Sequence, residues 1–188
     1  MDKIQVQAHL QRGQQLQKML YQLQKTYSLP ASKGKRNTAI GIINNIQLPF
    51  YADSKLNSVK HYKPYLGLYK VAFPCHNFLG DITLPMRLTP ELNFYHPSTP
   101  RFTFGKEKCA ERKIINEMIR HLKKSGNEKK ELSIEIYSDK EPCIYCLSAI
   151  KVQLPMFYPN LQVKIYFEQQ LDDMVHNPGD FSPEYKNK

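Results

Sequence analysis

Two short segments of the sequence carry residue types that bind metals and move protons. They are Cys109-Ala110-Glu111 and Pro142-Cys143-Ile144-Tyr145-Cys146. Three thiolates would fill three positions of a tetrahedral zinc ion and leave the fourth open, which is the arrangement of catalytic zinc sites. Glu111 stands two residues after the first thiol and would supply a carboxylate that takes a proton from an activated water.

A closed, structural zinc site is the alternative for the same cysteines. A Cys-x-x-Cys pair can also be a redox pair, half of a structural site or a chance occurrence. A closed site needs a fourth ligand, and the one remaining cysteine, Cys75, lies beside His76. We expect Cys75 to be an ordinary thiol and His76 a loop histidine, because the offset of Glu111 and the proline before Cys143 favour catalysis.

Both segments lie where a helix is expected to begin. The run from Cys109 to Lys124 has apolar residues at helical spacing, and Ser125-Gly126-Asn127 is expected to end it. The other face of this helix contains polar residues, among them Arg112, Lys113 and Asn116. Pro142 favours the first turn of a second helix, to about Gln153, with Cys143 and Cys146 on one face. Helix N-termini carry partial positive charge and stabilise the thiolate that binds zinc.

Four further segments have strand patterns, and their order indicates an α/β protein. They cover 38–46, 65–73, 132–137 and 161–167. The spacing of apolar residues predicts a glutamine-rich helix over 3–26. Its apolar stripe consists of Leu16, Met19, Leu20 and Leu23. We therefore divide the chain into a helical leader (1–30), a catalytic domain (31–170) and a tail expected to fray (171–188). The proline-rich stretch 74–104 is either a functional loop at the substrate entrance or a surface insertion.

The pattern Cys-x-Glu…Pro-Cys-x-x-Cys resembles that of the zinc-dependent nucleobase deaminases with three cysteine ligands. The resemblance covers roughly residues 38–168. It implies Zn²⁺ on Cys109, Cys143 and Cys146, and a three-layer α/β/α fold with a mixed four- to five-stranded sheet. It also implies a hydrolytic mechanism in which Glu111 takes the proton of the attacking water and passes it to the base. In three-cysteine cytidine deaminases the motif is also Cys-Ala-Glu-Arg, and there the arginine offsets thiolate charge. The similarity gives Arg112 that role, the alternative being a solvated arginine.

The segment between the second expected strand and Cys109 indicates which type of deaminase the chain resembles. Small cytidine deaminases have a ribose-binding segment with paired Asn and Glu there, and this sequence has no Asn-x-Glu after its second expected strand. A basic module behind a glutamine-rich helix looks more like the C-terminal deaminases of bacterial polymorphic toxins, some of which act on cytosine in DNA or RNA. A deaminase of a free nucleoside, nucleotide or related small molecule, and a zinc-stabilised binding module without catalysis, stay open as alternatives.

The charge of the chain bears on its partners. Lysine and arginine number 27 against 17 acidic residues, a formal net charge of +10. Such an excess favours single-stranded DNA or RNA, or an acidic protein, which for a toxin would be its immunity protein. Lys106, Lys108, Arg112 and Lys113 flank the first motif and are expected near the pocket mouth, where Arg101 would join them.

The cellular location is inferred from the absence of apolar segments. The sequence has no transmembrane run, and its first 25 residues lack the apolar stretch of a secretory signal. We expect no membrane association and a cytoplasmic site of action, with any delivery by a route that needs no cleavable signal. The sequence leaves the oligomeric state open.

Substrate contacts are the least determined part of the site. Asn44 and Asn45, at the end of the first expected strand, are candidates for holding the sugar or base. The aromatic residues Phe104 and Tyr145, with Phe73, are candidates for stacking on the base. The alternatives are turn-forming asparagines and core aromatics.

Overall fold

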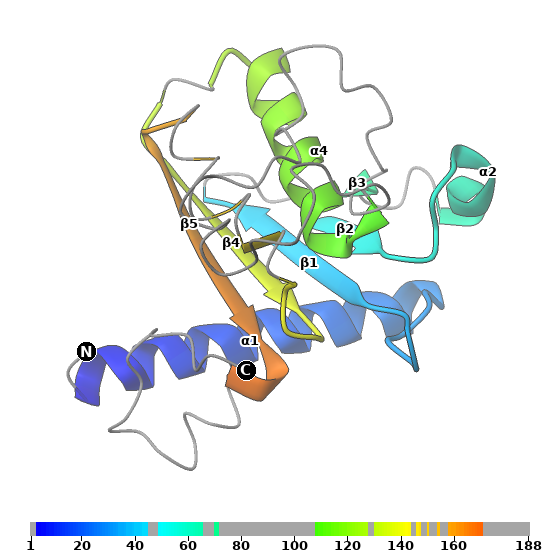
Figure 1. Ribbon diagram of the computed structural model, residues 1–188, viewed down its shortest axis with the longest axis horizontal. Coiled ribbons are helices and arrows are strands. Elements are labelled where there is room, and N and C mark those ends of the chain that lie inside the picture. The colour runs from blue at the N-terminus through cyan, green and yellow to red at the C-terminus, as the bar shows by residue number, and fades with distance from the viewer. Residues whose placement is uncertain are drawn as a thin grey trace, which may run out of the picture.

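The computed structural model places a five-stranded mixed sheet between two long helices (Figure 1). It describes residues 3–44, 49–65, 70–71, 108–127, 130–143, 146–147, 150, 154 and 158–170. The strand order is β3-β2-β1-β4-β5. The strands are β1 (Thr38–Ile43), β2 (Phe50–Asp53), β3 (Lys70–Val71), β4 (Leu132–Ser138) and β5 (Leu161–Phe167). β1 pairs antiparallel with β2 and β4, whereas β3 and β5 add parallel strands at the two edges. This is the predicted α/β architecture with a mixed sheet.

Alternation along the central strands separates two apolar layers. On β1, Ala39 and Ile43 belong to the cluster that packs on helix α4 (Ala110–Lys124), while Ile40 belongs to the cluster that packs on helix α1 (Lys3–Tyr27). Gly41 allows the closest approach, because a Cβ there would lie 2.5 Å from both Ile114 Cγ2 and Met118 Cε. A side chain at this position would push α4 away from the sheet.

Helix α1 covers the other face of the sheet along its length (Figure 1). Its buried side consists of Val6, Leu10, Gly13, Leu16, Leu20 and Gln24. Leu16 and Leu20 were expected on the apolar stripe and are fully buried, whereas Met19 is 37% exposed. The segment predicted as a leader therefore contributes one of the three layers, and its side chains complete the core beneath Ile40 and Tyr137.

Helix α4 begins and ends as its sequence predicts. Cys109 is its N-cap, and Gly126, with a φ of 67°, follows the C-cap Ser125. Asn127 N–H donates to the Leu122 carbonyl at 2.9 Å and Gly126 N–H to the Lys123 carbonyl at 3.1 Å. This pair of bonds is a Schellman motif, which requires a left-handed residue that glycine adopts without strain.

The second expected strand is confirmed only at β3, and one strand of the sheet was missed. The expected strand over 65–73 is represented in the described residues by the two-residue β3, while the 3-10 helix Lys63–Tyr65 includes its first residue. The strand that pairs with β1 is β2, which was not predicted. β2 is buried along all four residues, so it lacks the polar alternation by which half-buried strands are recognised. Asn44 ends β1 earlier than expected.

Two smaller observations complete the fold. A short helix, α2 (Val59–Tyr62), precedes the 3-10 turn. Among the helices in the described part of the chain, none is long and apolar enough to cross a membrane.

Candidate functional site

Three cysteines gather at the N-terminus of α4. The sulfur atoms of Cys109, Cys143 and Cys146 all lie within 4.8 Å of one another, and those of Cys143 and Cys146 are 3.5 Å apart. Zinc–sulfur bonds of about 2.3 Å in a tetrahedron require sulfur atoms roughly 3.8 Å apart, so these separations fit a shared metal ion. Among the described residues no fourth ligand of the histidine, cysteine or carboxylate type belongs to the group. Cys75 and His76 lie outside the described residues.

The mutual influence of these thiols on their pKa values favours a cation among them. The neighbouring Cys143 sulfur, reinforced by burial and opposed by the Cys146 sulfur, raises the pKa of the Cys109 thiol to about 12. The sulfurs of Cys109 and Cys143, together with burial, raise the pKa of Cys146 well above its usual value. Like groups held this close cannot all carry charge unless a cation lies among them. The donor set therefore fits a thiolate-binding divalent cation.

Local backbone structure explains how the cysteines meet. Cys109 has extended dihedrals as the N-cap of α4, and its carbonyl accepts from Lys113 N–H at 3.1 Å. The Cys143 carbonyl accepts from Leu147 N–H at 3.0 Å, which is the bond of a first helical turn. Both N-terminal turns thus contribute sulfur atoms to the cluster, as the spacing predicted.

The Glu111 carboxylate is buried against this cluster. Its side chain is 2% exposed, and Cys146 Sγ lies 3.7 Å from its Oε2. Burial raises the pKa of Glu111, while the hydrogen bond from Ser138 opposes that shift. A carboxylate in such surroundings holds a proton more readily than one in water, which suits a group that accepts and returns protons.

Two residues that the sequence analysis did not single out contact Glu111. Ser138 Oγ donates to Glu111 Oε1 at 2.6 Å, and Asn37 Nδ2 donates to the same oxygen at 2.8 Å. Asn37 directly precedes β1 and Ser138 ends β4, so both lie where these strands meet the segment that carries Cys109 and Glu111. Their positions at strand ends were the signal available in the sequence.

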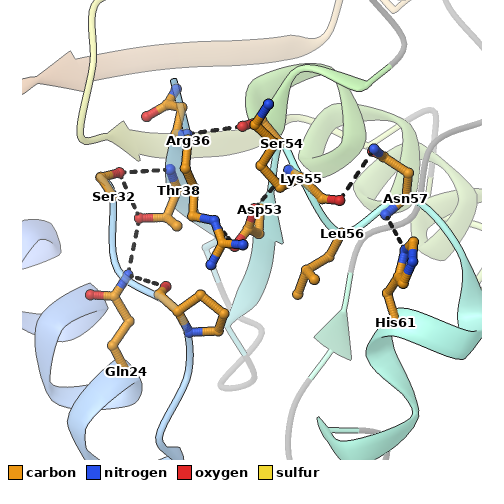
Figure 2. Close-up of polar contacts among 12 residues, drawn as sticks. Gln24, Ser32, Arg36, Thr38, Asp53, Ser54, Lys55, Leu56, Asn57 and His61 are labelled. Atoms are coloured by element: carbon orange, nitrogen blue, oxygen red, sulfur yellow. Dashed lines mark hydrogen bonds and ion pairs between the residues drawn. The ribbon is translucent and has the colours of Figure 1, made fainter. Parts of the chain in front are cut away.

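The chain segment that leads into β1 is fixed to the turn after β2 (Figure 2). Asn37 N–H donates to Ser54 Oγ, and Ser54 N–H donates to the Asn37 carbonyl, both at 2.9 Å. Arg36 Nε lies 3.5 Å from Oδ2 of the buried Asp53. Asn37 is therefore held at its backbone as well as by its side chain.

Helix α1 reaches the same segment through buried polar groups. Gln24 Nε2 donates to Thr38 Oγ1 at 3.0 Å, and Thr38 Oγ1 donates to an oxygen of Asp139 (Figure 2 shows the bond from Gln24 to Thr38). Asp139 N–H donates back to the Thr38 carbonyl at 3.0 Å. Since Asp139 follows Ser138, this network connects α1 to the residues around Glu111.

The cations of α4 do not lie where they were expected. Lys113 is fully buried, and its Nζ donates to the carbonyl oxygens of Asp53 at 2.5 Å and Leu56 at 2.7 Å. Burial lowers the pKa of Lys113 to about 7, although Asp53 opposes the shift. Arg112 is 2% exposed, so the solvated alternative for it is wrong. Arg112, Lys113 and Asn116, on the polar side of the expected helix, are all buried, and Lys113 packs on β2 and the turn that follows it.

The expected substrate contacts are only partly covered by the structure. Asn44 lies at the end of β1 opposite to Asn37 and Glu111, and its Oδ1 accepts from Ser133 N–H at 2.7 Å. It therefore closes the β1–β4 pair and does not join the cysteine cluster. The other candidates, Asn45, Phe73, Phe104 and Tyr145, lie outside the described residues, as do Lys106 and Arg101.

Comparison with protein-family models gives a match over most of the chain. Residues 24–169 match the family described as "Toxin-deaminase: The BURPS668_1122 family of deaminases". No curated protein and no solved structure matches the chain. The matched range includes the three cysteines, Glu111, Asn37 and Ser138.

Proposed function

This chain belongs to the toxin-deaminase family, and we propose that it is a zinc-dependent hydrolytic deaminase that converts cytosine to uracil in single-stranded nucleic acid. The observation that carries the proposal is the buried Glu111 carboxylate, whose Oε2 lies 3.7 Å from one of three clustered sulfur atoms. A proton-transferring group and a set of soft metal ligands occupy one site, as metal-assisted hydrolysis requires.

Cys109, Cys143 and Cys146 would hold the zinc ion. When bound, Zn²⁺ supplies a Lewis acid that lowers the pKa of water from about 15.7 toward ~7. Three thiolates and Zn²⁺ carry a net charge of −1, which weakens that effect. Arg112, buried beside Glu111, offsets this charge.

Glu111 moves the protons of the reaction. Water adds to C4 of cytosine, and the Glu111 carboxylate takes its proton. Glu111 returns that proton to the ring nitrogen N3, then takes the proton of the new C4 hydroxyl and gives it to the exocyclic amine. The C4–N4 bond breaks, ammonia leaves and the C4 carbonyl of uracil forms, so that one water is consumed for each ammonia released.

Exposed and half-buried lysines on the segments that carry Asn37 and Ser138 support a polynucleotide as the substrate. Lys33 and Lys35 are exposed on the turn that precedes Asn37, and Lys140 follows Ser138 by two residues. Lys140 Nζ donates to the carbonyl oxygen of Gly34, which joins the two segments. We call Lys33, Lys35 and Lys140 the basic rim. Cations near a reactive site attract the phosphates on either side of a target base. Single strands suit the site because a base stacked in a duplex is out of reach.

The family description also bears on the biological role. We propose that the chain is a toxin effector module acting on cytoplasmic nucleic acid. An immunity protein that neutralises it would present an acidic surface to the basic rim, because opposite charges steer association and exclude the substrate.

The test is a direct assay of zinc-loaded protein. It is incubated with cytidine, deoxycytidine, their nucleotides, and single-stranded DNA and RNA oligonucleotides, and uracil and ammonia are measured. We expect uracil in oligonucleotides, and a loss of about 10²–10⁴-fold in Glu111→Ala, the range for general acid–base groups. Product from monomers but never from oligonucleotides would favour the small-molecule alternative. Unchanged turnover in Glu111→Ala would refute the mechanism.

A further inference from the structure

We propose that Asn37 and Ser138 are positioning residues that clamp one oxygen of Glu111, so that only the other oxygen exchanges protons with the substrate. This proposal rests on the proposed function, because it assigns different roles to the two oxygens of the Glu111 carboxylate. It follows from three hydrogen bonds among three buried or half-buried side chains.

The protons available on Asn37 and Ser138 account for all three hydrogen bonds. Ser138 has one hydroxyl proton, which it donates to Glu111 Oε1 at 2.6 Å. Asn37 Nδ2 has two protons and donates one to Glu111 Oε1 and the other to Ser138 Oγ, each at 2.8 Å. Ser138 thus accepts one bond and donates one. The amide of Asn37 must present its nitrogen here, because a carboxylate oxygen only accepts.

The two oxygens of Glu111 consequently differ. Oε1 receives two donors, whereas Oε2 points toward the cysteine cluster and lies 3.7 Å from Cys146 Sγ. Hydrogen bonds to a carboxylate in a buried setting are strong and directional. The clamp therefore fixes the side-chain torsions of Glu111 and directs Oε2 at the place where the substrate must react.

Strand pairing explains why these donors are well placed. Ala39 lies opposite Ser138 in the antiparallel β1–β4 register, so Asn37 and Ser138 are diagonal neighbours on the same face of the sheet. That face also packs against α4, whose first turn carries Glu111. Backbone bonds from Asn37 to Ser54 hold the amide in place. Ser138 is the last residue of β4 and Asn37 directly precedes β1, so the central strands fix both donors better than a free loop would.

Loss of either donor, Asn37 or Ser138, should slow only the chemical step of the reaction. Without one donor, the carboxylate gains rotational freedom and its Oε2 spends less time in the reactive position. A displacement of 1 Å can cost about 10²-fold in rate, so we expect kcat to fall about 10- to 100-fold in Ser138→Ala and in Asn37→Ala. KM should change little, because neither side chain is assigned a contact with the substrate.

Zinc-loaded variants assayed on a cytosine-containing single-stranded oligonucleotide test the clamp. Ser138→Thr keeps the hydroxyl and should restore most of kcat. Asn37→Asp keeps the shape but replaces the donor with an acceptor, and should lose more activity than Asn37→Ala. A parent-like kcat in Ser138→Ala, or a rise in KM with kcat unchanged, would overturn the proposal.

A second measurement separates failure of the clamp from failure of the proposed function. Urea unfolding of Ser138→Ala, Glu111→Ala and the double variant forms a cycle that needs no activity. The clamp predicts that the double variant loses less stability than the sum of the single losses. Additive losses would refute the clamp. Coupling together with no deamination of any substrate would leave the clamp intact and refute the proposed function.

Discussion

Lys113 Nζ on helix α4 donates to the carbonyl oxygen of Asp53, the last residue of β2, at a distance of 2.5 Å. This cation was expected at the pocket mouth among groups that contact phosphate. It instead satisfies carbonyl groups in the turn after β2, including that of Leu56. In the described part of the chain, the basic rim and the exposed Lys108 remain candidates for contacting the proposed polynucleotide.

Removal of rim charges should weaken the salt dependence of substrate binding. Neutralising a lysine that contacts a phosphate reduces the slope of log K against log salt by about 0.7 for a single strand. We expect this change in Lys33→Ala, Lys35→Ala or Lys140→Ala, measured by fluorescence anisotropy with a labelled oligonucleotide. Lys18→Ala, an exposed change on α1, is the matched control and should keep the parent slope. If all four variants gave the same slope, the basic rim would not be part of the surface that binds the oligonucleotide.

Metal content should depend on the three clustered cysteines and not on Glu111. Changing Cys109, Cys143 or Cys146 to Ala should release most of the zinc and lower the stability, because metal binding is coupled to folding. Glu111→Ala should keep the metal, since the carboxylate transfers protons and is no ligand. Elemental analysis of purified protein measures both.

A fourth cysteine provides the control for this prediction. Cys75→Ala should retain zinc at the parent level. Loss of zinc equal to that of Cys109→Ala would indicate a closed structural site and contradict the catalytic assignment.

Helix α1 should be required for folding rather than serve as a dispensable leader. Leu20 is fully buried under the sheet, so Leu20→Ala should lower the free energy of unfolding by about 2–5 kcal/mol. Met19, one residue away and 37% exposed, is the matched control, and Met19→Ala should cost less than about 0.5 kcal/mol. Urea denaturation compares the two. Similar losses would mean that α1 does not pack as described.

His9 should make the fold less stable in mild acid. Burial lowers the pKa of His9, although Gln170 and Glu135 oppose the shift and Lys164 adds to it. The unfolded chain therefore takes up a proton near pH 6.5 that the folded chain does not, so stability falls as pH drops through that value.

The matched variant for His9 is a phenylalanine. His9→Phe keeps a ring against Tyr166, whose ring centroid lies 4.4 Å from that of His9, and removes the titration. The stability of the variant relative to the parent should rise as pH falls below 6.5 and stay constant above it. A difference independent of pH across this range would contradict the assignment.

Much of the site could be read from the sequence because its signals are local. Offsets of two and three residues fix Cys109 relative to Glu111 and Cys143 relative to Cys146, and helix caps act within one turn. The boundaries of α4, β4 and β5 follow from periodicity and from Gly126 for the same reason. These features depend on neighbours in the chain, so the sequence determines them without knowledge of the fold.

What the sequence left open depended on contacts between distant segments. The burial of Lys113 is decided by carbonyl groups about sixty residues earlier, and the pairing partner of β1 by four buried residues without alternation. Asn37, Ser138 and Glu111 meet only because β1 and β4 pair in one register beneath α4. The sequence by itself determined which atoms could do the chemistry, whereas only the tertiary structure decided which oxygen of Glu111 is held and which faces the cysteines, because hydrogen bonds between distant strands leave no periodic trace.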